Sequence, residues 1–225
     1  MSIRRIQYQI TYVHILTFRD EYKIAVNPYF IFDNVEYGVA NENTLDEEIT
    51  LIFRNEHIAF ILRKDSITFL YEGDVKDLKD QNGVIRFYWE LYDKIKKFNG
   101  YNKTVSHQLI SNAVIVQDEE KNKSLLSNNE YLAINHFGKL DDFACTYQLS
   151  RGNLFTKLQL GGFSRKDIKN YDLSPFRTEY NRDLFTNVGI MGRLELSEPE
   201  KSPTFSKFKS LLNKAEEDFG LYNLI

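Results

Sequence analysis

The chain has 225 residues, of which 42% are hydrophobic and 27% charged, so it can build one large domain or two small ones around a packed core. Its 29 basic and 32 acidic side chains give a formal net charge of −3, which excludes a globally cationic nucleic-acid coat, a disordered tail and a collagen-like chain. The single cysteine excludes a disulfide framework and a thiolate zinc cluster within the chain, no apolar run approaches the ~18 residues of a membrane span, and no signal peptide is visible.

The first part of the chain is expected to form strands. Residues 6–12 alternate apolar and polar side chains, which is the period of a half-buried strand. Stretches rich in β-branched and aromatic residues predict two more strands at 22–26 and 29–39, separated by a turn at Asn27 and Pro28. Short apolar runs at hairpin spacing then predict a three-stranded meander, formed by residues 48–54, 58–63 and 67–72.

One helix is expected in this part of the chain, at residues 84–98. Apolar side chains recur there at helical spacing, lysines gather at the C-terminal end, where the helix dipole favours cations, and Gly100 supplies a stop. A polar loop at 74–83 precedes the helix, and one long strand or two strand pieces follow it at 104–117. The polar and charged segment 118–130 is the best linker candidate.

The rest of the chain is expected to add more strands and a closing helix. The predicted strands are 131–137, a hairpin of 143–149 with 154–160, and 188–196. A capping-box pattern starts a short helix at Ser164. The last helix covers 203–219, with Ser202 as its cap and Pro203 at its first position.

These elements predict an α+β fold in which antiparallel sheets, built as a meander and hairpins, pack against two main helices. We expect a strand-rich N-terminal half at 1–117, closed by the helix 84–98, and a strand-rich C-terminal half at 131–225, closed by the helix 203–219. Residues 118–130 are then a linker or a long loop, and a single domain that contains both halves is the alternative.

The sequence contains no coherent catalytic or metal-binding pattern. The four histidines have no metal-ligand spacing, and only His107 and His136 could meet Asp141 or Asp142 in three dimensions. Runs of acids lie in loops, where carboxylates are usually solvated. Alternation places Cys145 on one face with Phe143 and Tyr147, so we expect it in the core, where a thiol is inert. We therefore predict no catalytic residue, no cofactor and no metal.

A phosphate or nucleic-acid ligand is the alternative. Residues 161–166 place two glycines, a hydroxyl and two cations before a possible helix start, although they do not match the Walker pattern. Residues 28–82 contain twelve acids and five bases, whereas residues 151–214 contain seven acids and twelve bases with aromatic residues among them. The candidate residues for such a ligand are basic: Arg151, Arg165, Lys166 and Lys169.

The helices favour a protein interface over a pocket. Ile85, Trp89 and Tyr92 extend the apolar arc of the helix 84–98 past half its circumference, so that this helix needs cover on two sides, from its own chain or from a partner. The last helix ends in Glu216, Glu217 and Asp218, which oppose the helix dipole unless cations hold them.

We therefore expect a non-enzymatic interaction or scaffold protein that acts in a protein assembly. Its partners would be proteins, either copies of itself or other chains, with nucleic acid as a less favoured partner and no membrane. The abundance of Asn, Lys, Ile, Tyr and Phe is typical of a low-GC bacterium or its phage, so a phage structural component or a bacterial defence complex would suit this origin. The expected location is the cytoplasm, or a virion if a phage encodes the chain.

Overall fold

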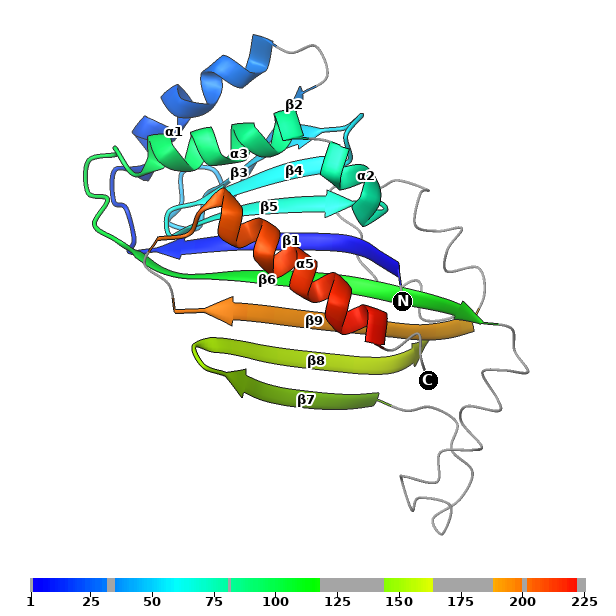
Figure 1. The fold of residues 1–225 in the computed structure, drawn as a ribbon. Coiled ribbons are helices and arrows are strands. Elements are labelled where there is room, and N and C mark those ends of the chain that lie inside the picture. Colours follow the sequence, from blue (N-terminus) through cyan, green and yellow to red (C-terminus); the bar gives the residue numbers. More distant parts are fainter. Residues whose placement is uncertain are drawn as a thin grey trace.

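One antiparallel sheet forms the centre of the protein. The computed structural model describes residues 2–31, 35–80, 82–117, 144–163, 188–199 and 202–221. Nine strands of the described chain join in the order β2-β3-β4-β5-β1-β6-β9-β8-β7, and all neighbours are antiparallel (Figure 1). The strands are β1 Ser2–Tyr12, β2 Val35–Ala40, β3 Glu48–Phe53, β4 Ile58–Arg63, β5 Ser66–Glu72, β6 Thr104–Gln117, β7 Ala144–Arg151, β8 Leu154–Phe163 and β9 Val188–Glu198. The predicted α+β class with antiparallel strands is confirmed.

The described helices lie on one face of this sheet (Figure 1). The four α-helices of the described chain are α1 Phe18–Val26, α2 Val75–Asp80, α3 Asn82–Ile95 and α5 Phe205–Leu221. The longest, α5, crosses β1, β6 and β9, whereas α3 runs above β3, β4 and β5 and contacts α1. The expectation of two main helices is not confirmed, because α1 also contributes Phe18 and Tyr22 to the core and α2 lies in the predicted polar loop.

Most of the strand predictions are confirmed, both those from alternation and those from short apolar runs. β1, the β3–β5 meander, β6, the β7–β8 hairpin and β9 all lie where the sequence predicts strands. In β3 the burial alternates strictly, since Ile49, Leu51 and Phe53 point into the core. The predicted strand at 131–137 and the predicted helix at Ser164 lie outside the described residues.

The predicted strand at 22–26 is wrong, and the one at 29–39 is confirmed only at 35–39, since 29–31 is helical and 32–34 lies outside the described residues. Residues 18–26 form α1, residues 27–31 form a 3-10 helix, and only Val35–Ala40 is a strand. Phe18, Tyr22, Ala25 and Val26 are buried at the i, i+4, i+7, i+8 spacing of a helix, so the packing of one helical face overrides the β propensity of single residues.

The start of α5 differs from its prediction by two residues. The helix begins at Phe205, and the hydroxyl Oγ1 of Thr204 accepts a hydrogen bond from the backbone N–H of Lys207 at 3.2 Å. Thr204 is therefore the N-cap, and Ser202 and Pro203 precede the helix. The stripe of Phe208, Leu211, Leu212, Ala215 and Phe219 is buried against the sheet as the spacing predicts.

The hairpin of β7 and β8 forms one end of the sheet. Its two-residue turn places Gly152 at φ +63°, in the left-handed region that favours glycine. The expected core position of Cys145 is wrong: Cys145 is only half-buried and Tyr147, on the same face, is 51% exposed, because β7 is an edge strand that no described helix crosses. β6 of the first half pairs along its length with β9 of the second, and the proposed division into halves stays a prediction.

Candidate functional site

The apolar residues expected at an interface on the helix 84–98 pack inside the chain. Ile85 and Tyr92 are buried, and Trp89 is half-buried with its ring centroid 5.9 Å from that of Tyr8 and 6.4 Å from that of Phe205 on α5. Helix α5 therefore supplies the second cover that this wide apolar arc needs. Of the two kinds of cover that the sequence allows, the structure shows one from the chain itself, and an interface role of Ile85, Trp89 and Tyr92 stays a prediction.

The acidic end of the last helix is held by a lysine of the same helix. Lys214 Nζ lies 2.7 Å from Oδ1 of Asp218 and 3.7 Å from Oε2 of Glu217, one turn away. Glu216 is half-buried beside them. These pairs reduce the unfavourable interaction of the acids with the helix dipole. An interface role of Glu216, Glu217 and Asp218 stays a prediction.

The candidate phosphate residues lie almost entirely outside the described chain. Arg151 ends β7, and its side chain is not described. Arg165, Lys166 and Lys169 lie outside the described residues, as do His136 and Asp141. Within the part of the chain that the structure describes, no group of three metal-ligating side chains converges.

The structure instead joins three residues that the sequence keeps far apart. His107 of β6 is fully buried, and its Nδ1 lies 3.1 Å from the hydroxyl of Tyr8 on β1. Its Nε2 lies 3.5 Å from Oε2 of Glu198, its direct partner on β9. Burial raises the pKa of Tyr8 far above its usual value, so this hydroxyl keeps its proton and can donate a hydrogen bond to Nδ1 of His107. In the tautomer with a proton on Nε2, Nδ1 accepts the hydrogen bond from Tyr8, and the 3.5 Å approach of Nε2 to Glu198 is an electrostatic contact rather than a hydrogen bond.

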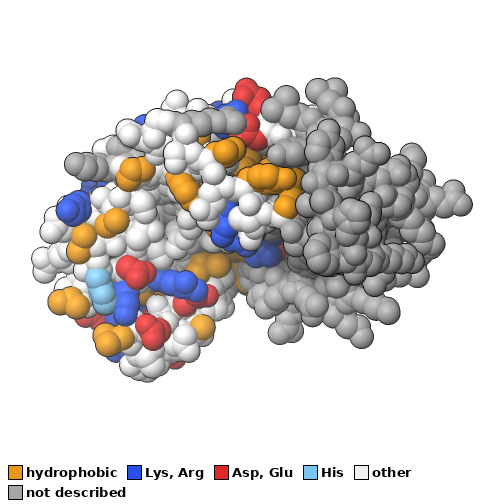
Figure 2. All heavy atoms as spheres, turned by 90° about the horizontal axis from the view of Figure 1, so that it is seen from below, with side chains coloured by type: hydrophobic (Ala, Val, Ile, Leu, Met, Phe, Trp, Pro, Cys, Tyr) orange, Lys and Arg blue, Asp and Glu red, His pale blue; other side chains and the backbone are white. Residues whose placement is uncertain are grey.

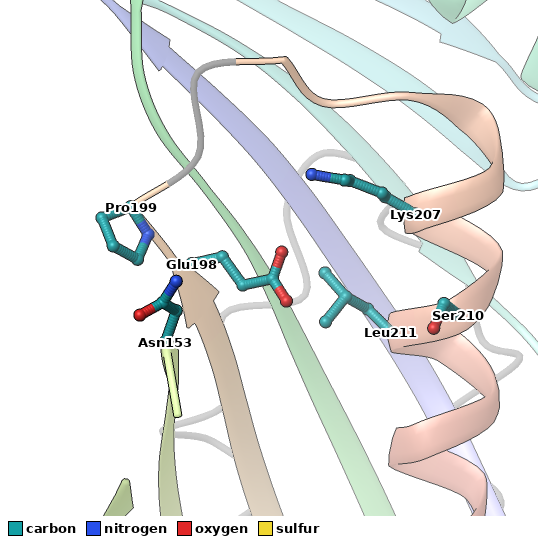
Figure 3. A pocket seen from close by; sticks show the side chains of 6 residues that line it. All are labelled: Asn153, Glu198, Pro199, Lys207, Ser210 and Leu211. Atoms are coloured by element: carbon teal, nitrogen blue, oxygen red, sulfur yellow. The ribbon is translucent and has the colours of Figure 1, made fainter. Parts of the chain in front are cut away.

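The side chain of Glu198 lines a pocket of about 340 Å³ between the sheet and α5 (Figure 3). Asn153 lines it from the β7–β8 turn, and Glu198 and Pro199 from the end of β9. Lys207, Ser210 and Leu211 line it from the first turns of α5. The side chain of Glu198 is 29% exposed and points from the sheet toward α5 (Figure 3). This pocket therefore contains an acid and a base that come from opposite walls.

The outer strand β7 is the second candidate site. Among the described strands it has a neighbour only on the β8 side, and it is eight residues long. Its residues from Ala144 to Ser150 carry no charge, and Leu149 is 48% exposed. In a view from below, the side on which β7 lies, hydrophobic side chains reach the surface beside basic ones (Figure 2). An edge strand that is uncharged except for Arg151 at its end, and that exposes apolar side chains, is a template for pairing with another chain.

The opposite edge strand, β2, is different. It has six residues, and its exposed Glu36 forms a bidentate pair with Arg54, both contacts being 2.6 Å. A short edge that carries charges discourages pairing with other strands. The two edges of the sheet therefore differ in the feature that controls strand addition.

Comparison with known proteins leaves the family open. The chain matches no protein-family model, and no curated protein resembles it closely enough in sequence to count as a relative. None of the described helices has the length and apolar character that a membrane crossing requires.

Proposed function

We propose that this chain is a non-enzymatic interaction protein of a protein assembly, and that β7 pairs with β7 of a second copy. The observation that supports the proposal best is the edge position of β7 among the described strands, together with its uncharged residues 144–150, of which 146–150 are exposed. Every second residue of an edge strand presents its backbone N–H and C=O to the open side, where another strand can bind them. Pairing across a two-fold axis would close a dimer and remove this edge from both copies.

A second copy suits this strand better than a charged partner does. Cys145, Tyr147 and Leu149 lie on one face of β7, and Thr146, Gln148 and Ser150 on the other. An antiparallel register centred on Gln148 places Tyr147 opposite Leu149 of the second copy, so apolar side chains meet on one face and polar ones on the other. No like charges face each other along this stretch.

The test is the solution mass by light scattering over a wide range of protein concentration. We expect a shift from monomer to dimer for the wild type, and a monomer for Leu149→Lys at concentrations where the wild type is dimeric. Leu45→Lys is the matched control, since Leu45 is 75% exposed in the loop before β3. A wild-type monomer throughout, or equal dimerisation of both variants, would exclude β7 as the contact.

We include in this proposal a phage or bacterial-defence assembly, and a cytoplasmic or virion location. The composition of the chain is their only support. The alternative of a phosphate- or nucleic-acid-directed enzyme or binder rests on residues 151–214, most of whose candidate residues lie outside the described chain. Binding to nucleic acid that weakens steeply with added salt would favour it.

A further inference from the structure

The pocket beside Glu198 differs from the other described surface hollows because a buried polar chain leads into it. Tyr8 and His107 lie under α5, and the ring of Tyr8 packs 5.0 Å from that of Phe208. Buried hydroxyl and imidazole groups cost free energy unless they are hydrogen-bonded. The hydrogen bond between Tyr8 and His107 offsets part of this cost, and the 3.5 Å electrostatic contact of His107 with Glu198 continues the polar chain to a carboxylate in the pocket.

This chain of contacts orients Glu198. The pairing of His107 with Glu198 across β6 and β9 fixes where the carboxylate leaves the sheet. With its proton on Nε2, His107 faces Oε2 of Glu198, and the carboxylate is directed toward α5 (Figure 3). His107 and Tyr8 are therefore positioning residues for one acidic group in the pocket.

The lining of the pocket indicates the chemistry of its ligand. Glu198 can accept hydrogen bonds from a cationic group of a ligand, and Lys207, on the wall formed by α5, can donate them to an anionic group. Asn153 and Ser210 add neutral polar groups, whereas Leu211 and Pro199 offer apolar surface to an aliphatic stem. A metal ion would need at least three converging ligands, which the described residues do not bring together here.

We propose that this pocket binds a small zwitterion, a molecule of amino-acid size that carries one ammonium and one carboxylate group. Glu198 binds the ammonium group and Lys207 binds the carboxylate. This inference does not depend on the pairing of β7, since none of these side chains belongs to that strand.

The experiment titrates the protein with γ-aminobutyrate and with two probes that keep only one of its charges, n-butylammonium and butyrate. Binding is followed by the NMR shifts of the backbone amides of Ser210 and Leu211. We expect saturable shifts with γ-aminobutyrate and at least tenfold weaker binding of each single-charge probe. Glu198→Gln should weaken the binding of γ-aminobutyrate at least tenfold, so that this variant binds γ-aminobutyrate no more tightly than it binds butyrate. Lys207→Gln should weaken the binding of γ-aminobutyrate by a similar factor, so that this variant binds γ-aminobutyrate no more tightly than it binds n-butylammonium.

Matched controls lie on the same two elements. Glu195 is on β9 but on the opposite face of the sheet and pairs with Arg193, and Lys209 is on α5 with its Nζ 4.4 Å from the ring centroid of Phe205. Glu195→Gln and Lys209→Gln should bind γ-aminobutyrate as the wild type does. The absence of saturable shifts in the wild type, equal binding by all four variants, or binding of only one single-charge probe would overturn the proposal.

Discussion

Nε of Arg5 lies 3.8 Å from Oε1 of Glu72, its direct partner across β1 and β5. The side chain of Glu72 is fully buried, and neither carboxylate oxygen has a hydrogen-bond partner among the described residues. Burial raises the pKa of this carboxyl to about 7, and the nearby Arg5 opposes the shift only in part. Glu72 is therefore a buried acid that the folded state holds better in its neutral form.

Glu72 should make the free energy of unfolding depend on pH. Its pKa is higher in the folded state than in the unfolded chain, where the usual value is 4.5. Below pH ~4.5 the carboxyl is neutral in both states and its ionisation does not change the free energy of unfolding. As the pH rises through about 7 the ionisation lowers this free energy progressively. Above that pH the loss is complete, at most about 3 kcal/mol. In urea unfolding, the free energy of unfolding of Glu72→Gln should fall less than that of the wild type as the pH rises from 5 to 8. Glu36→Gln, a change at an exposed acid, should follow the wild type, and identical pH dependence of all three proteins would contradict this account.

The contact between Tyr12 and Tyr22 should stabilise the docking of α1. Their hydroxyl oxygens are 2.6 Å apart, and Tyr12 also donates to the carbonyl of Arg63 at 2.9 Å. Tyr12→Phe removes both hydrogen bonds, and the hydroxyl of Tyr22 then keeps only its 3.5 Å contact with the carbonyl of Arg63. We therefore expect the free energy of unfolding, measured with urea, to fall by about 2 kcal/mol. Tyr29→Phe, which removes one 3.5 Å contact to the carbonyl of Phe87, should cost less. Equal losses would mean that the buried tyrosine pair contributes little.

Trp89 should act as a core residue and not as an interface residue. Its ring contacts those of Tyr8, Tyr88, Tyr92 and Phe205, so Trp89→Ala should destabilise the chain by about 3 kcal/mol. Trp89→Phe should cost less because it leaves a smaller cavity. The solution mass of either variant, measured under conditions where it is folded, should equal that of the wild type. A variant with unchanged stability and a lower mass would restore Trp89 to an interface.

Periodicity predicts this fold best where it is unambiguous. The alternation in residues 6–12 and the helical stripe in 203–219 appear as β1 and α5. The strand predictions failed at 22–26 and 29–31, because aromatic and β-branched residues there favour strands when they are considered singly. The helical spacing of Phe18, Tyr22 and Val26 was the better indicator.

The candidate sites depend on information that the sequence does not display. His107 and Glu198 are neighbours only because β6 and β9 pair in one register, and 90 residues lie between them in the chain. A signal did exist: both residues fall on the face of their strand that also carries Leu109 and Leu196, where polar side chains are costly. The edge position of β7 among the described strands could not be predicted either, because it follows from the order of strands in the sheet.

The pairing of two β7 strands can be tested most directly by disulfide cross-linking. In a Cys145→Ser background the chain has no other cysteine, so single cysteines can be placed at residues 146, 147, 148 and 149 in turn. A two-fold antiparallel pairing brings one position opposite its own copy, and we predict that Gln148→Cys forms the disulfide-linked dimer most rapidly, with cross-linking falling off on both sides. Slow, equal cross-linking at all four positions, no faster than that of a Leu45→Cys control, would contradict the proposed contact.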